Sequence, residues 1–238
     1  MPVPSVSVVI AAYNEDRTIA TIVEIVYAWG RAHEIIVVDD GSTDRTAKSV
    51  ARLRPGVTLI SYTKNRGKGY ALAQGIKKST GDILMFLDGD ITGLTRLDLD
   101  AMMDPILHNR ADMVLGVARF SKVGSFAPFD GLTGERVMWR KAVVGHVSKM
   151  LDAGRGVEFL FNDLHRRKRV VSVDLPYVAI MGKWERGNAP VAAVDYLKEA
   201  MEFVRQITKL QAGDLPPKAK RALRAVYGYL SQALDYFQ

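Results

Sequence analysis

The sequence predicts an α/β protein in which a mostly parallel sheet is flanked by helices. Short apolar runs alternate with segments of helical periodicity over the first 90 residues, and only a few residues join one element to the next. This alternation is typical of parallel strands covered by helices on both faces. The four runs expected to be strands are residues 5–12, 34–38, 57–62 and 81–88.

Each connection between these strands carries a helix signal. Apolar residues recur at helical spacing over 19–26, after acidic residues that favour a helix N-terminus. After the second strand, Thr43 or Asp44 is suited to cap a helix. After the third strand, the basic, glycine-containing loop 64–69 leads into a helix through residues 72–76.

The fourth strand ends in two carboxylates separated by one glycine, Asp88-Gly89-Asp90. Open α/β sheets bind ligands at the carboxyl ends of their strands. Two neighbouring carboxylates repel each other unless a cation or several donors compensate. A divalent metal carried on a diphosphate would do so, and we therefore expect this motif to hold the metal of a sugar nucleotide.

Polar clusters also follow two earlier strands, at Asn14-Glu15 and at Asp39-Asp40. Right-handed crossovers bring the ends of parallel strands to one edge of the sheet. The acidic residues of all three clusters are therefore expected to be spatial neighbours.

The second half of the chain is less regular. Residues 119–134 are rich in Gly, Ser, Phe and Pro and are expected to form a long loop, a feature that is usually functional in compact domains. The other expected elements are strands at 112–118 and 170–174, helices at 135–150 and 157–164, and two amphipathic C-terminal helices at 197–207 and 223–237.

Composition narrows the class of protein without identifying it. The 238 residues carry a formal charge of +7, contain no cysteine, and include no apolar run of the roughly 18 residues needed to span a bilayer. The N-terminus lacks the basic region of a signal peptide, so a cytoplasmic or membrane-peripheral location is expected. No zinc-ligand spacing or other nucleic-acid-binding signature is present, so no nucleic-acid partner is expected.

Four motifs, in order and at suitable spacing, resemble those of family 2 glycosyltransferases with the GT-A fold. They are residues 9–15 (VIAAYNE), 37–44 (VVDDGSTD), 65–69 (NRGKG) and 88–90 (DGD). Within that family, the chain is most similar to polyprenyl-phosphate sugar transferases and related inverting enzymes, since 132–137 resembles their acceptor-side motif and 154–158 their glycine-rich turn before an acidic residue. The resemblance implies a GT-A domain over 1–190, divided into a nucleotide-sugar half (1–118) and an acceptor half (119–190), followed by C-terminal helices in 191–238.

The resemblance also implies a donor site for a UDP- or GDP-sugar. Asp88 and Asp90 would engage the ribose and a bridging Mg²⁺ or Mn²⁺, while Asp39 and Asp40 would flank the nucleoside. Hard cations that keep substrate phosphates in their shell suit such oxygen ligands. The residues assigned to nucleotide-sugar binding are Ala12, Tyr13, Glu15, Asp39, Asp40, Lys68, Asp88, Gly89 and Asp90, with Arg66 beside them.

On the acceptor side, two kinds of acceptor remain open. A small hydroxyl acceptor, such as a glycerate or a saccharide, needs a general base, whereas a polyprenyl phosphate is already anionic. The candidate bases are Glu158, then Asp163, then Asp130, and the residues expected to bind the acceptor are Thr133, Gly134, Arg136 and Arg119, with Arg140 as a further cation.

Several alternatives stay open at the level of sequence. A nucleotidyltransferase would normally place a glycine-rich, Arg-Lys-bearing loop after the first strand, where this chain has residues 11–15 (AAYNE). A sugar-nucleotide-binding protein without turnover would share the same motifs. Related enzymes often supply a histidine metal ligand after the last sheet strand, but residues 178–184 contain none. The C-terminal helices could pack on the domain, form a homodimer or lie on a membrane through Lys218, Lys220, Arg221 and Arg224.

Overall fold

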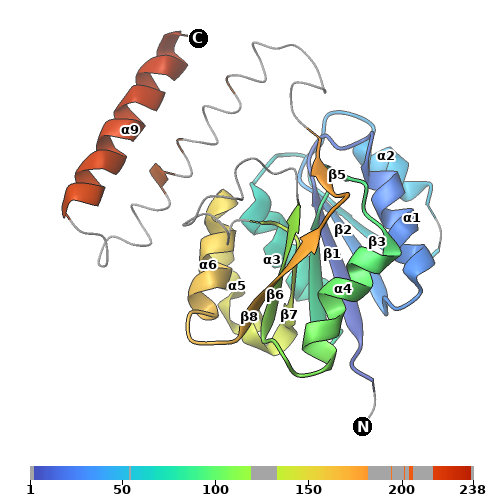
Figure 1. The fold of residues 1–238 in the computed structure, drawn as a ribbon. Coiled ribbons are helices and arrows are strands. Elements are labelled where there is room, and N and C mark those ends of the chain that lie inside the picture. The colour runs from blue at the N-terminus through green and yellow to red at the C-terminus, as the bar shows by residue number, and fades with distance from the viewer. Residues whose placement is uncertain are drawn as a thin grey trace.

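A seven-stranded sheet forms the centre of the computed structural model (Figure 1). The structure describes residues 3–53, 55–118, 133–181 and 217–236, together with residues 194, 201, 204 and 205. The strand order is β3-β2-β1-β4-β7-β6-β8, and every pairing that does not involve β7 is parallel. The strands are β1 (Val6–Ala12), β2 (Glu34–Asp39), β3 (Val57–Ser61), β4 (Ile83–Asp88), β6 (Met113–Ala118), β7 (Arg136–Trp139) and β8 (Val170–Leu175).

Helices cover both faces of the sheet, as the alternating sequence pattern predicts. On one face lie α1 (Ile19–Trp29), α2 (Thr46–Ala51) and α4 (Arg96–Leu107). On the other lie α3 (Lys68–Lys78), α5 (Val147–Met150) and α6 (Val157–Leu164). Alternate residues of β1 serve the two faces, with Val8 and Ile10 in the first core and Val9 in the second.

The order of the strands creates a switch point between β1 and β4. The chain moves outward from β1 to β2 and β3, and then returns across the opposite face through α3 to place β4 on the other side of β1. A crevice outside the carboxyl ends of the strands at such a point is the usual ligand site of an open α/β sheet.

The expectation of one helix over 135–150 was wrong for its first part. Residues Arg136–Trp139 instead form β7, which inserts antiparallel between β4 and β6. Short 3-10 turns follow, and α-helix is confined to the four residues of α5. Neighbouring apolar residues of β7 serve opposite cores, Val137 the first and Met138 the second, so the strand shows no alternation of apolar and polar residues that would separate it from a helix.

Two further elements were not expected from the sequence. Helix α4 begins with a reciprocal capping box between Thr95 and Asp98 and contains Pro105. The strand β5 (Ile91–Thr92) follows directly after the Asp88-Gly89-Asp90 turn, and it pairs with β9 (Ala179–Ile180) in a small second sheet.

At the C-terminus, the second expected amphipathic helix is present as α9 (Pro217–Tyr236), which Figure 1 shows apart from the sheet. The first, at 197–207, lies almost entirely outside the described residues. Among the residues that the structure describes, no helix is both long and apolar enough to cross a membrane.

Candidate active site

The carboxyl ends of β1, β2 and β4 meet at one edge of the sheet. Ala12 of β1 is paired with Asp39 of β2, and Ala11 is paired with Asp88 of β4. The expected proximity of the Asp39 and Asp88 regions, which are far apart in sequence, is therefore confirmed.

The Asp88-Gly89-Asp90 turn packs closely on the end of β1. The Gly89 N–H donates to the Ala11 carbonyl oxygen (3.1 Å), and the Thr18 hydroxyl donates to the Gly89 carbonyl oxygen (2.6 Å). A Cβ atom at Gly89 would lie 3.1 Å from Cγ of the buried Glu15. Glycine therefore allows the turn to sit against β1, and it leaves the side chains of Asp88 and Asp90 half-buried.

Asp40 holds the basic loop in place. Its two carboxylate oxygens accept hydrogen bonds from the backbone N–H groups of Arg66 (2.9 Å) and Gly67 (2.7 Å). Burial raises the pKa of Asp40, and these backbone donors offset part of that rise. A Cβ atom at Gly41 would lie 2.6 Å from the Lys64 carbonyl carbon, so the loop rests directly on the turn after β2.

Asp39 is also buried and engaged by the protein. It accepts hydrogen bonds from the Ser42 N–H (3.1 Å) and from the Ser61 hydroxyl (2.7 Å). Of the remaining residues expected on the donor side, Ala12 is buried and Tyr13 is exposed. The expected contacts of Asp39 and Asp40 with a nucleoside stay predictions, since their oxygens have protein partners here.

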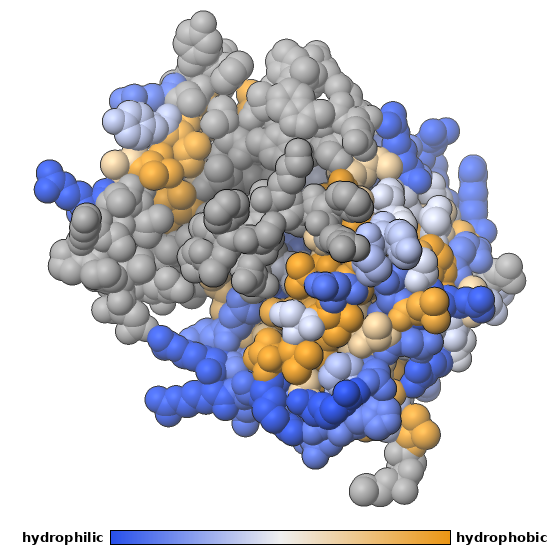
Figure 2. Space-filling model, in the orientation of Figure 1, coloured by the Kyte–Doolittle hydropathy of each residue, from blue (hydrophilic) through white to orange (hydrophobic). Residues whose placement is uncertain are grey.

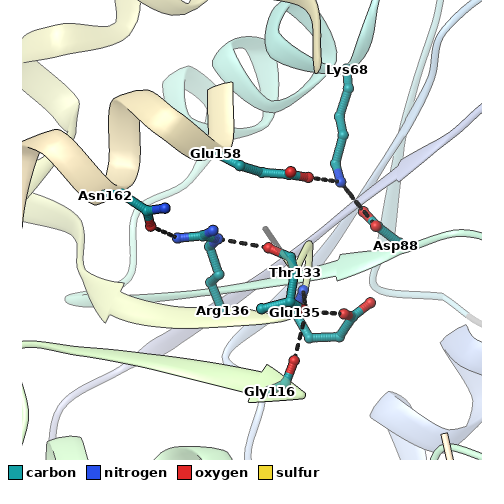
Figure 3. Close-up of polar contacts among 8 residues, drawn as sticks. All are labelled: Lys68, Asp88, Gly116, Thr133, Glu135, Arg136, Glu158 and Asn162. Atoms are coloured by element: carbon teal, nitrogen blue, oxygen red, sulfur yellow. Dashed lines mark hydrogen bonds and ion pairs between the residues drawn. The ribbon is translucent and has the colours of Figure 1, made fainter. Parts of the chain in front are cut away.

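Lys68 links Asp88, at the end of β4, to Glu158 on α6 (Figure 3). Its Nζ lies 2.7 Å and 2.9 Å from the two carboxylate oxygens of Asp88, and 2.7 Å from Oε1 of Glu158. Burial alone would lower the pKa of Lys68, but the two carboxylates outweigh it and raise that pKa above its usual value. Glu158, the first candidate for the general base, is thus brought beside the expected metal-binding motif.

Glu135 is a buried carboxyl group that the sequence analysis missed. Burial and the charge of Asp88 raise its pKa to about 7. Its Oε1 has no hydrogen-bond partner within the described part of the chain. Glu135 was expected to begin a helix. The local signal that could have identified it is its place within residues 132–137, which resemble the acceptor-side motif of the family.

The contacts of Thr133 agree with a protonated Glu135. The Thr133 hydroxyl oxygen lies 2.6 Å from the Gly116 carbonyl oxygen and 2.6 Å from Oε2 of Glu135 (Figure 3). The hydroxyl has one proton and the carbonyl can only accept, so both contacts are satisfied together when the Glu135 carboxyl donates to Thr133.

Arg136 lies behind the site. Its side chain is fully buried; the guanidinium donates to the Thr133 carbonyl oxygen (2.8 Å) and to Oδ1 of Asn162 (2.7 Å), and burial lowers its pKa to about 10. The expectation that Arg136 contacts the acceptor does not fit this position. Arg136 instead ties the Thr133-Gly134 segment to α6, and a Cβ atom at Gly134 would overlap the Asp88 carboxylate.

Two other residues expected in the acceptor half, Asp163 and Arg140, are not brought to this cluster. Asp163 is exposed, and five residues along α6 place it about 140° around the helix from Glu158. Arg140 lies at the opposite edge of the sheet, where its backbone N–H donates to the Asp82 carbonyl oxygen (2.9 Å). Arg119, like Asp130, lies outside the described residues.

The donor set at the turn fits a metal that is carried by a substrate. No group of three or more His, Cys, Asp or Glu able to hold a metal occurs among the residues that the structure describes. Two carboxylates at one turn, Asp88 and Asp90, suit Mg²⁺ or Mn²⁺ when phosphate oxygens and water complete the shell.

A mostly parallel sheet with this switch point and acidic edge is the architecture of the GT-A fold. Residues 7–142 match the family described as Glycosyl transferase family 2. The chain belongs to this family, as its four motifs predicted.

Individual relatives are similar over part of their length. An undecaprenyl-phosphate 4-deoxy-4-formamido-L-arabinose transferase of Pseudomonas paraeruginosa is 38% identical over 98 residues, which cover 38% of this chain and 29% of the relative. A poly-beta-1,6-N-acetyl-D-glucosamine synthase of Staphylococcus aureus is 34% identical over 114 residues, which cover 47% of this chain and 27% of the relative. The matches thus span less than a third of either relative.

Solved structures of glucosyl-3-phosphoglycerate synthase from Mycobacterium tuberculosis share the fold. The complex with Mn²⁺, UDP-glucose and phosphoglyceric acid has a TM-score of 0.67 at 22% identity, covering 86% of this chain and 79% of that one. The complex with Mg²⁺ and UDP has a TM-score of 0.68 at 24% identity, covering 88% and 79%.

Proposed function

We propose that this chain is a metal-dependent, inverting glycosyltransferase that moves a hexose from a UDP- or GDP-sugar to a polyprenyl phosphate. The observation that carries the proposal is the ion pair of Asp88 with Lys68 beside the Gly89-Asp90 turn. Family membership supports transfer chemistry. The relative that uses undecaprenyl phosphate supports the acceptor, and the neighbours crystallised with UDP and Mn²⁺ or Mg²⁺ support the donor and the metal.

In this proposal the edge of the sheet holds the donor. Asp88 and Asp90 would hold the cation, which would supply positive charge to the departing nucleoside diphosphate. Glu15, Asp39 and the loop held by Asp40 form the nucleoside side. The acceptor approaches from Thr133 and Gly134, with Arg119, and attacks the anomeric carbon directly.

A small hydroxyl acceptor is the second candidate, and the position of Glu158 favours it. The carboxylate of Glu158 reaches the same ammonium that contacts Asp88, so a base is available where the acceptor would arrive. A hydroxyl acceptor requires such a base, whereas a phosphate does not.

Replacing Asp88 tests the proposed function. With a UDP- or GDP-sugar, Mn²⁺ and polyprenyl phosphate, we expect Asp88→Asn to lower the transfer rate by at least about a hundredfold, because the leaving group loses its charge stabilisation. The matched control is Asp82→Asn, near the other end of the same strand, where Asp82 accepts from the Ser5 N–H and hydroxyl. Equal rates for Asp88→Asn and the unchanged protein, or no transfer by the unchanged protein with any nucleotide sugar, would contradict the proposal.

A further inference from the structure

The position of Lys68 is fixed by the backbone on both sides of the site. Lys68 begins α3 directly after Gly67, whose N–H is held by Asp40. The next residue, Gly69, packs so tightly that a Cβ atom there would lie 2.9 Å from the Gly154 carbonyl oxygen. Residues Gly154–Gly156 lead straight into α6, so the first turns of α3 and α6 approach each other at this point.

The ammonium of Lys68 lies against both carboxylates. It donates hydrogen bonds to Oδ2 of Asp88 (2.9 Å) and to Oε1 of Glu158 (2.7 Å), and it lies 2.7 Å from Oδ1 of Asp88 as an ion pair. The three side chains are only 15–24% exposed. Charge-assisted contacts of this kind are the strong ones, particularly where water is partly excluded.

A divalent cation that binds the same two oxygens of Asp88 competes with this ammonium for them. Two cations that share one carboxylate repel each other, and each of them alone already neutralises the negative charge of that carboxylate. The incoming diphosphate is also anionic, so it offers the displaced ammonium a new partner while Glu158 remains its other one.

We propose that Lys68 is a positioning residue whose ammonium competes with the divalent metal for the Asp88 carboxylate. Lys68 thereby couples binding of the donor to the position of the Glu158 side chain. This inference rests on the proposed function, because the competing metal is the one carried by the donor. The protein alone then binds metal weakly, and the metal binds well together with the nucleotide.

The test measures binding of Mn²⁺ alone to the full chain, from the electron paramagnetic resonance signal of free Mn²⁺. Removing the ammonium in Lys68→Met frees Asp88, so we expect Mn²⁺ to bind at least roughly tenfold more tightly without nucleotide. Lys68→Arg keeps a cation on Asp88 and should retain the weak binding. Lys68→Gln, which is neutral but able to hydrogen-bond both carboxylates, should follow Lys68→Met and serves if the methionine variant fails to fold.

The matched control is Arg66→Met, which removes an equal charge two residues away. The Arg66 guanidinium donates to the Tyr70 hydroxyl (2.7 Å), so its loss should leave the affinity for Mn²⁺ alone within about twofold. Unchanged or weaker Mn²⁺ binding by both neutral variants of Lys68 overturns the inference, as does an equal gain in Arg66→Met. Binding of a nucleotide sugar with Mn²⁺ by the unchanged protein is measured in parallel. If the unchanged protein does not bind them, the proposed function is overturned. If it does bind them, a negative result with the Lys68 variants overturns only the inference about Lys68.

Discussion

Burial raises the pKa of Glu135 to about 7, so this carboxyl group keeps its proton in the mildly acidic range where an ordinary glutamate is ionised. Glu135 is 3% exposed, and its carboxyl group lies within the field of the Asp88 charge. One of its carboxyl oxygens has no hydrogen-bond partner within the described chain. Ionising it would place a second negative charge beside Asp88 in a poorly solvated position. The electrostatics of the site therefore depend on Glu135 as well as on Asp88, Lys68 and Glu158.

Replacing Glu135 should change how stability depends on pH. Its pKa is raised from 4.5 to about 7, so the folded state binds more protons than the unfolded state between these values. The free energy of unfolding therefore contains a contribution that is fully present below pH 4.5 and is lost as pH rises through 7. We expect Glu135→Gln to match the unchanged protein at about pH 4.5 and to exceed its stability by about 3 kcal/mol at about pH 8, in urea unfolding. A difference that is the same at both pH values would contradict this prediction.

Helix α6 decides which acidic side chain of the acceptor half reaches the site. It begins at the glycine-rich turn that packs against α3, and this contact directs Glu158 toward Lys68. Asn162, one turn further along, accepts from Arg136, while Asp163 is exposed. The helix therefore presents one face to the site and leaves the other in solvent.

Glu158→Gln separates the two candidate acceptors. With a hydroxyl acceptor the variant loses its general base, and we expect the transfer rate to fall by about 10² to 10⁴. With a polyprenyl phosphate the acceptor is already ionised, and we expect a change of less than about tenfold. Asp163→Asn on the same helix is the control and should change neither rate. A large loss with the phosphate acceptor would show that Glu158 acts in another way.

Across the described surface of the protein, positive charge is not confined to the basic loop 64–69 that Asp40 holds. Exposed basic residues occur at 77–78, where α3 ends, and at 166–169, before β8, both near the amino edge of the sheet. Figure 2 shows hydrophilic side chains over the lower part of this face, where the strands begin in Figure 1. The net charge of +7 is thus carried partly by the edge opposite Asp88.

Homodimerisation and membrane contact through α9 stay predictions.

Binding of the donor should stabilise the entire fold, because the site draws residues from several strands and helices. At a hundred times the dissociation constant, a nucleotide sugar with Mn²⁺ adds about 2.7 kcal/mol to the free energy of unfolding. For a chain of this size we expect the melting temperature to rise by roughly 5–10 °C. The shift should disappear when EDTA removes the metal. The absence of a metal-dependent shift with UDP-, GDP- and TDP-sugars would contradict the donor site.

Local sequence patterns were enough to predict the alternating strands and helices of the first 90 residues, and the acidic turn at Asp88-Gly89-Asp90. Periodicity and strand ends can be read within a short window of residues, which is why these features did not depend on knowing the fold. The same holds for the expectation that Asp39 and Asp88 lie at one edge, since right-handed crossovers leave few other arrangements.

The acceptor side, in contrast, depends on contacts between distant parts of the chain. β7 is a strand because it lies between β4 and β6, and that pairing, absent from any local pattern, buries Glu135 and Arg136 and brings Gly134 against Asp88. The contact of Lys68 with Glu158 joins residues 90 positions apart and depends on α3 packing against the turn before α6. Long-range packing determines burial and charge pairing. The motifs therefore predicted that Asp39 and Asp88 lie at one edge of the sheet, while the structure was needed to find the partners of Asp88.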